Sequence, residues 1–232
     1  PGLYNPENGL IFNANNRIIT ESYPYLISDR FPAEYRALRL QERLAETPTN
    51  HRLEDSMSIQ TDSVSTAAQR LVPLFLKAEP NTEQATEALQ LLRDWDFSMD
   101  RKLAAPALYM AMLNEVVRVL AEDDLGPDAF MEFWRADADF AELALGQVPH
   151  WCDDIRTTPV ESCKWALSTA LDRAVFKLSE DQGSAVSDWR WGDMHTAPMK
   201  HQLLSLVPGL AYLGNRPIET SGGDHTLNRG QS

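Results

Sequence analysis

The strongest constraint on the fold is that apolar residues recur at helical spacing over most of the chain. The clearest stripe spans residues 103–120 and carries Ala107, Met110, Leu113, Val116, Val117 and Leu120. A second stripe spans residues 161–178 and carries Cys163, Ala166, Leu167, Ala170, Leu171, Ala174, Val175 and Leu178. We therefore predict a helical middle over residues 32–180, interrupted at Gly126-Pro127 and including a segment at 128–145.

The two ends of the chain, residues 1–16 and 210–230, lack this periodicity and are predicted to form strands. Leu10–Phe12 is a short apolar run between turn residues, and weaker strand signals occur at 211–213 and 225–227. An isolated strand leaves its backbone groups without a ladder, so strands at both ends predict missing sheet partners. We expect an α+β chain, and its start at Pro1 rather than Met suggests a piece of a longer or processed protein.

Charge and hydropathy argue against two classes of partner. The formal net charge is −13, from 34 acidic and 21 basic residues. A nucleic-acid surface needs a basic footprint to displace counterions, and an anionic membrane would also repel this chain. No stretch contains the roughly 18 consecutive apolar residues that span a bilayer. We expect neither nucleic acid nor membrane as a partner.

A cluster of amides follows the first predicted strand, in the run Asn13-Ala14-Asn15-Asn16-Arg17. An uncharged amide offers two N–H donors, which suits it to stabilise an oxyanion that forms on an attacked carbonyl. The alternative is a simple turn, because Asn is common in turns and tolerates left-handed backbone. The residues alone leave both interpretations open.

Other polar segments have ordinary explanations when each is taken alone. Arg36 lies on a predicted helix, where an arginine is usually solvated or paired, and Asp62 lies at a corner between two predicted helices, where it can cap. Asp193, His195 and His201 suggest a third possibility, a metal-dependent hydrolase, but their spacing matches no standard zinc motif.

The chain has two cysteines, Cys152 and Cys163, and they do not form a CxxC pair. A disulfide closing a short loop and two buried free thiols are both compatible with the sequence. Asn50 is expected to cap a short helix that contains Leu53, Met57 and Ile59.

The order of six segments is more informative than any one of them. A strand ending in NANNR is followed by YRALRL, IQTDSVS, LRDWD, WGDMH with a later His, and GGDHTLN. This succession resembles an internal segment of the large subunit of the penicillin acylase family, over nearly all of the chain. The resemblance implies an N-terminal nucleophile hydrolase with an αββα sandwich fold. Such enzymes cleave linear amides and release an acyl group from β-lactam nuclei, homoserine lactones or similar amines.

The resemblance also implies roles for particular residues. Asn15 matches the oxyanion-hole Asn of the family, and Arg36 matches the active-site Arg that orients it. Asp29 matches a segment that supplies a ligand to a structural calcium, whose other ligands would lie outside this chain, and a carboxylate is a suitable ligand type. No cofactor is expected for catalysis.

The family's nucleophile is a Ser at the start of the large subunit, whose own α-amine acts as base, and it would lie upstream of Pro1. We therefore expect the isolated chain to be inactive. Its partners would be the small subunit, the remainder of the large subunit and a small N-acyl substrate. The family acts in the periplasm or outside the cell, which favours a disulfide between Cys152 and Cys163.

One further alternative is a non-enzymatic helical module for binding or scaffolding. It explains the helical middle and the lack of an internal Ser-His-Asp or metal motif. It does not explain why an amide-rich segment at Asn15 is followed by Arg36 at the distance typical of the family.

Overall fold

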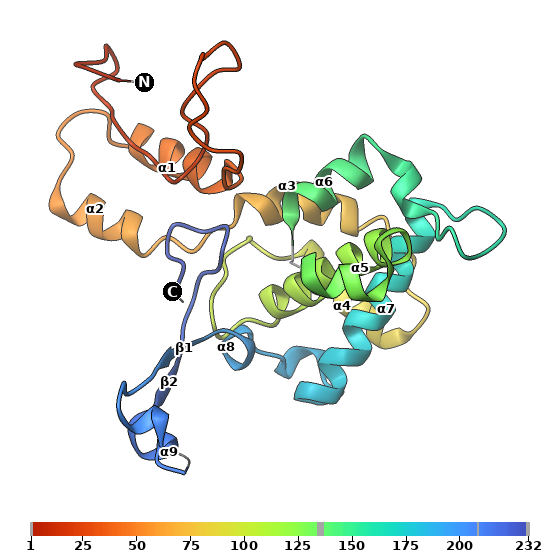
Figure 1. The fold of residues 1–232 in the computed structure, drawn as a ribbon. Coiled ribbons are helices and arrows are strands. Elements are labelled where there is room, and N and C mark those ends of the chain that lie inside the picture. The colour runs from red at the N-terminus through yellow and green to blue at the C-terminus, as the bar shows by residue number, and fades with distance from the viewer. Residues whose placement is uncertain (1, 134–136, 208, 231–232) are drawn as a thin grey trace.

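The computed structural model of the protein describes residues 2–133, 137–207 and 209–230 (Figure 1). Its α-helices are α1 (Tyr35–Ala45), α2 (Leu53–Gln60), α3 (Thr66–Phe75), α4 (Glu83–Arg93), α5 (Ala104–Phe133), α6 (Ala138–Gly146), α7 (Cys163–Gln182), α8 (Trp191–Met194) and α9 (Ala211–Gly214). Its strands are β1 (Thr196–Met199) and β2 (Arg216–Glu219). The predicted helical character of the middle of the chain is confirmed.

The core forms around α5 and α7, which pack against each other, with α4 and α6 also contacting α5. Both predicted apolar stripes are buried, including Leu113 and Leu120 on α5 and Leu171 on α7, each fully inaccessible to solvent. Alanines at positions 166, 170 and 174 of α7 are buried as well. Small side chains at this spacing let two helices approach closely.

The backbone breaks inside α5 where the sequence predicted an interruption. Gly126 has φ 74° and ψ 159°, values outside the helical region, and Pro127 follows it. Glycine takes positive φ without the steric cost that a Cβ would add. The helical segment predicted over 128–145 is thus divided between the end of α5 and α6, and its residues 134–136 lie outside the described residues.

By length and composition alone, residues Ala104–Glu132 of α5 could cross a membrane, although polar residues interrupt the apolar run in the sequence. Mean hydropathy reaches 1.2 in the most apolar window, and 72% of that window is buried inside the structure. The apolar face of α5 is therefore used to form the protein core.

Residues 2–34 and α1 lie to one side of the helical body, together with α2 (Figure 1). The prediction that Asn50 caps α2 is wrong. Arg52 occupies the N-cap, and the Asp55 carboxylate accepts its backbone N–H at 2.8 Å. Asn50 instead takes a left-handed conformation with φ 61° in the preceding turn.

The strands lie elsewhere than the sequence predicted. Residues 10–12, 211–213 and 225–227 form no strand, and 211–213 belongs to α9. β1 and β2 instead pair as an antiparallel ladder, with Thr196 opposite Glu219 and Met199 opposite Arg216. Only β2 falls within the predicted region 210–230. An apolar run becomes a strand only when a neighbour supplies the ladder, and residues 10–12 have no such neighbour in the described chain.

A disulfide between Cys152 and Cys163 joins a short 3₁₀ helix, Pro149–Cys152, to the first residue of α7. The two Cα atoms are 4.8 Å apart, and the cysteines are separated by 11 positions in the sequence. Hydrogen bonds also order the loop between them, since the Asp153 carboxylate accepts the backbone N–H of Glu161 at 2.9 Å.

Replacing both cysteines, as Cys152→Ala with Cys163→Ala, should lower the free energy of unfolding by about 2–3 kcal/mol. The reason is that the cross-link no longer closes a loop in the unfolded chain, which therefore gains conformational entropy. Urea denaturation monitored by circular dichroism measures the change. Alkylation before and after reduction, read by mass spectrometry, provides the chemical test. Modification of both thiols without a reductant would contradict the pairing.

Candidate functional site

The amide-rich segment at residues 13–17 folds back on itself. The Asn13 side-chain oxygen accepts the backbone N–H of Asn15 at 2.8 Å, and the Asn16 side-chain oxygen accepts that of Ala14 at 3.2 Å. Asn15 has φ 64°, a left-handed conformation that Asn tolerates better than most residues. The turn predicted as one alternative is therefore present, and its side-chain bonds present the Asn15 side chain at the surface.

Arg36, near the start of α1, contacts this turn directly. Its Nη2 donates to the carbonyl oxygen of Ala14 at 2.9 Å and to Oδ1 of Asn15 at 3.1 Å. A guanidinium has no acceptor, so the amide must turn its oxygen toward Arg36 and its Nδ2 group away. The structure thus brings together the two residues that the sequence singled out, in an orientation that leaves two N–H donors of Asn15 facing outward.

The charge of Arg36 is not neutralised by a close carboxylate. Within the described chain, no Asp or Glu oxygen lies within ion-pair distance of it, and both of its acceptors are uncharged. Burial lowers the pKa of Arg36, and the nearby Arg229 lowers it further, while Asp224 acts in the opposite direction. Its positive field is therefore available to a negative charge that develops beside Asn15.

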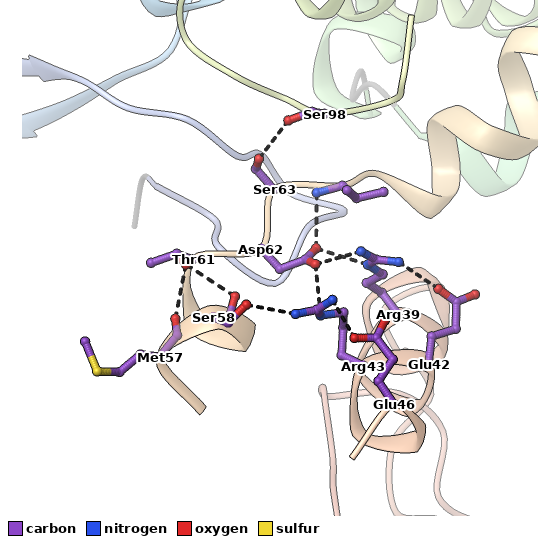
Figure 2. A network of polar contacts seen from close by, with 11 residues as sticks. Arg39, Glu42, Arg43, Glu46, Met57, Ser58, Thr61, Asp62, Ser63 and Ser98 are labelled. Atoms are coloured by element: carbon purple, nitrogen blue, oxygen red, sulfur yellow. Dashed lines mark hydrogen bonds and ion pairs between the residues drawn. The ribbon is translucent and has the colours of Figure 1, made fainter. Parts of the chain in front are cut away.

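A buried carboxylate, Asp62, holds α1 one turn further along (Figure 2). Arg39 donates from Nε to Oδ1 at 3.1 Å and from Nη2 to Oδ2 at 2.7 Å, a two-point contact. Arg43 approaches the same Oδ2 through Nε at 3.3 Å. Asp62 also accepts the backbone N–H of Val64 at 3.2 Å. The predicted capping role is wrong, because Ser65 is the N-cap of α3 and Thr61 is the C-cap of α2.

Sequence reasoning missed the ion pairs of Arg39 and Arg43. A signal was present, because arginines at positions 36, 39 and 43 share one face of a helix. Spacing alone could not show which carboxylate they meet, since Asp62 lies 23 residues from Arg39.

Tyr35 anchors the start of α1 in the helical core. Its hydroxyl donates to Glu142 at 2.8 Å, and its backbone carbonyl accepts the Thr66 hydroxyl at 2.8 Å. The ring of His225 meets the Tyr35 ring edge-on at 5.3 Å. Burial lowers the pKa of His225, Arg36 lowers it further, and Asp224, Asp139 and Asp137 oppose the shift.

The other predicted sites are not assembled. Among the described residues, no group of three or more His, Cys, Asp or Glu side chains could hold a metal ion. His195 stacks on Trp191 and bonds through Nδ1 to Thr220, and His201 accepts backbone N–H groups of its own loop. Asp29 lies exposed in a loop, and no group of potential metal ligands includes it among the described residues.

Comparison with known proteins identifies the class. The sequence profile of the penicillin amidase family matches residues 1–232. The chain belongs to the penicillin amidase family, which confirms the resemblance seen in the order of its motifs.

Individual relatives are similar at a moderate level. The acyl-homoserine lactone acylase QuiP of Pseudomonas aeruginosa is 28% identical over 262 residues, which cover 97% of this chain and 30% of the relative. The QuiP of Pseudomonas putida is 29% identical, covering 95% of this chain and 29% of the relative. The penicillin acylase 2 proenzyme of Pseudomonas sp. (strain SE83) is 28% identical over 236 residues, which cover 97% of this chain and 29% of the relative. The chain thus spans about 30% of the length of these curated relatives.

Stability near the site should depend on pH through His225. Its pKa is lower in the folded state than the ordinary value of 6.5, so the unfolded chain binds the proton more readily. The free energy of unfolding should fall as pH drops from about 7.5 to about 5.5. The loss should reach about 1.4 kcal/mol per pH unit once the pH is below 6.5, the ordinary pKa of histidine.

His225→Phe keeps an aromatic ring against Tyr35 and should flatten this slope. Urea denaturation at several pH values measures it, with His51→Phe, at an exposed histidine, as the control that keeps the wild-type slope. Equal slopes in wild type and His225→Phe would assign the pH dependence to other groups.

Proposed function

We propose that this chain is a segment of an N-acyl amidohydrolase and contributes to its oxyanion hole. The contact between Arg36 and Asn15 carries the proposal, because it fixes an uncharged donor next to a cation that has no carboxylate of the described residues within ion-pair distance. Membership of the penicillin amidase family supports it, as do relatives named acyl-homoserine lactone acylase and penicillin acylase. The substrate class that follows is a linear amide on a β-lactam, a homoserine lactone or a similar amine.

The chemistry follows from the orientation of the amide. Attack on an amide carbonyl moves negative charge onto the oxygen, and donors placed in advance stabilise that charge. Because Oδ1 of Asn15 accepts from Arg36, its Nδ2 group points outward with its hydrogens available to the oxyanion. Arg36 positions this amide and adds a positive charge behind it. In the proposal the nucleophile is an N-terminal Ser in the rest of the enzyme, with its own α-amine as base.

The remainder of the proposed enzyme supplies what this segment lacks. Its partners are the small subunit and the rest of the large subunit, which together complete an αββα sandwich. The proenzyme name of one relative supports a processed precursor. A disulfide in the structure supports a periplasmic or secreted location. A structural calcium would use Asp29 as one ligand and take the others from outside this chain.

In the complete enzyme, Asn15→Gly should lower kcat by about 10²–10³-fold with little change in KM, because one oxyanion-hole donor is lost. Glycine adopts positive φ freely, so this variant keeps the turn and removes only the amide. Steady-state kinetics with a chromogenic acyl amide measures the effect. Wild-type activity in Asn15→Gly would mean that Asn15 is only a turn residue, and it would favour the scaffold alternative.

Asn50→Ala is the control for the effect of general destabilisation on kcat. Asn50 also has a left-handed φ, 61° against 64° for Asn15, but it lies in the turn before α2. Its replacement should cost stability without changing kcat. A comparable loss of kcat in Asn50→Ala would mean that general destabilisation explains both variants.

The 232-residue chain by itself should show no amidase activity, because the proposed nucleophile belongs to the rest of the enzyme. Incubating the purified chain with chromogenic phenylacetyl and fatty-acyl amides should give neither a burst nor a steady release of product. Release that scales with chain concentration would place a nucleophile within these residues.

A further inference from the structure

Three arginines on one face of α1 divide into two groups by what they bind. Arg36 contacts the Asn15 turn, whereas Arg39 and Arg43 both contact Asp62 (Figure 2). Arg39 lies three positions beyond Arg36, about one helical turn, so whatever fixes Arg39 also fixes the direction in which Arg36 points.

The contact with Asp62 is well shielded from solvent. The Asp62 side chain is 6% exposed, and those of Arg39 and Arg43 are 15% and 21% exposed. Charge-assisted, two-point contacts between a guanidinium and a carboxylate fix geometry as well as contributing energy. Glu42 and Glu46 also pair with Arg39 and Arg43 respectively, from more exposed positions.

Asp62 and the adjacent Ser63 bond to three other parts of the molecule. Its Oδ1 accepts the N–H of Val64, just before α3, and its carbonyl accepts the N–H of Asn228 at 2.8 Å. The adjacent Ser63 carbonyl accepts the N–H of Met99 at 2.9 Å, next to the start of α5. The position of Asp62 is therefore set by the helical core and by the C-terminal segment.

A helix held at one end can still tilt or rotate about that point. Tyr35 holds the start of α1, through Glu142 and Thr66. Asp62 supplies the second point of attachment, further along the same helix. With both points fixed, Arg36 keeps the direction that reaches the Ala14 carbonyl and the Asn15 side chain together.

We propose that Asp62 is a positioning residue for the oxyanion hole, acting through Arg39 and Arg43 on α1 to hold Arg36 against Asn15. The inference rests on the function proposed above. It adds a residue that touches neither substrate nor Asn15, and it makes the ion pairs of α1 part of the active-site geometry.

In the complete enzyme, Asp62→Asn should lower kcat per folded molecule on the order of 10- to 100-fold and leave KM unchanged, as expected when a small displacement affects only the transition state. The control is Asp123→Asn, at a carboxylate on α5 that is 8% exposed and accepts the Ile155 N–H at 2.8 Å. It should lose stability but retain kcat. An unchanged kcat in Asp62→Asn, or an equal loss in Asp123→Asn, overturns the proposal.

A double-mutant cycle with Arg39→Gln tests whether the ion pair is the cause. The Asp62→Asn/Arg39→Gln variant should be no less active than the poorer single variant, because both partners act through one contact. It also removes the Arg39 charge that Asp62→Asn leaves without its buried partner, while Arg43 keeps its contact with Glu46, so it remains informative where Asp62→Asn alone does not fold. Multiplied losses in the double variant would overturn the proposal.

Asp62→Glu tests the ion pair further, and comparison with Asn15→Gly separates this inference from the function on which it rests. Asp62→Glu keeps the charge and should recover part of the lost kcat, whereas loss as severe as in Asp62→Asn would contradict an ion-pair role. If Asn15→Gly retains activity, the oxyanion-hole function itself fails. If Asn15→Gly is impaired but Asp62→Asn keeps full kcat, the positioning role alone fails.

Discussion

The carboxylate of Asp62 connects the N-terminal part of the chain to the helical core. Burial of apolar faces on α5 and α7 holds the core together, but α1 buries only Tyr35 and Ala37 fully and is placed by a few specific contacts. A nearly buried carboxylate is costly to desolvate, and here two guanidinium groups and a backbone N–H offset that cost. The arrangement of the candidate site depends on this interaction because α1 carries Arg36.

The turn at Asn15 combines two properties that first seemed to be alternatives. The residue is left-handed, as a turn residue would be, and its amide is also oriented by Arg36. Backbone strain of this kind is tolerated where surrounding contacts determine the conformation, and such positions cluster at functional sites. The turn explains how the amide is presented, and the guanidinium explains which of its atoms faces outward.

Helices were predictable where the apolar period was long, as in α5 and α7, because burial of one face depends on local spacing. The break at Gly126 was predictable from residue type. The strands were not, since a strand needs hydrogen bonds from a neighbour that local sequence does not specify. Residues 10–12 are apolar and residues 225–227 include Thr226 and Leu227, yet only Thr196–Met199 and Arg216–Glu219 pair as strands in the described chain.

The sequence by itself determined the helical middle, the family resemblance and the choice of Asn15 and Arg36, because these depend on residue type, period and order. Only the tertiary structure decided that Arg36 bonds to Oδ1 of Asn15, that Arg39 and Arg43 share Asp62, and that His225 packs on Tyr35. Each of these contacts joins residues more than 15 positions apart. Such contacts follow from how the helices pack, and packing is a property of the whole fold rather than of any short segment.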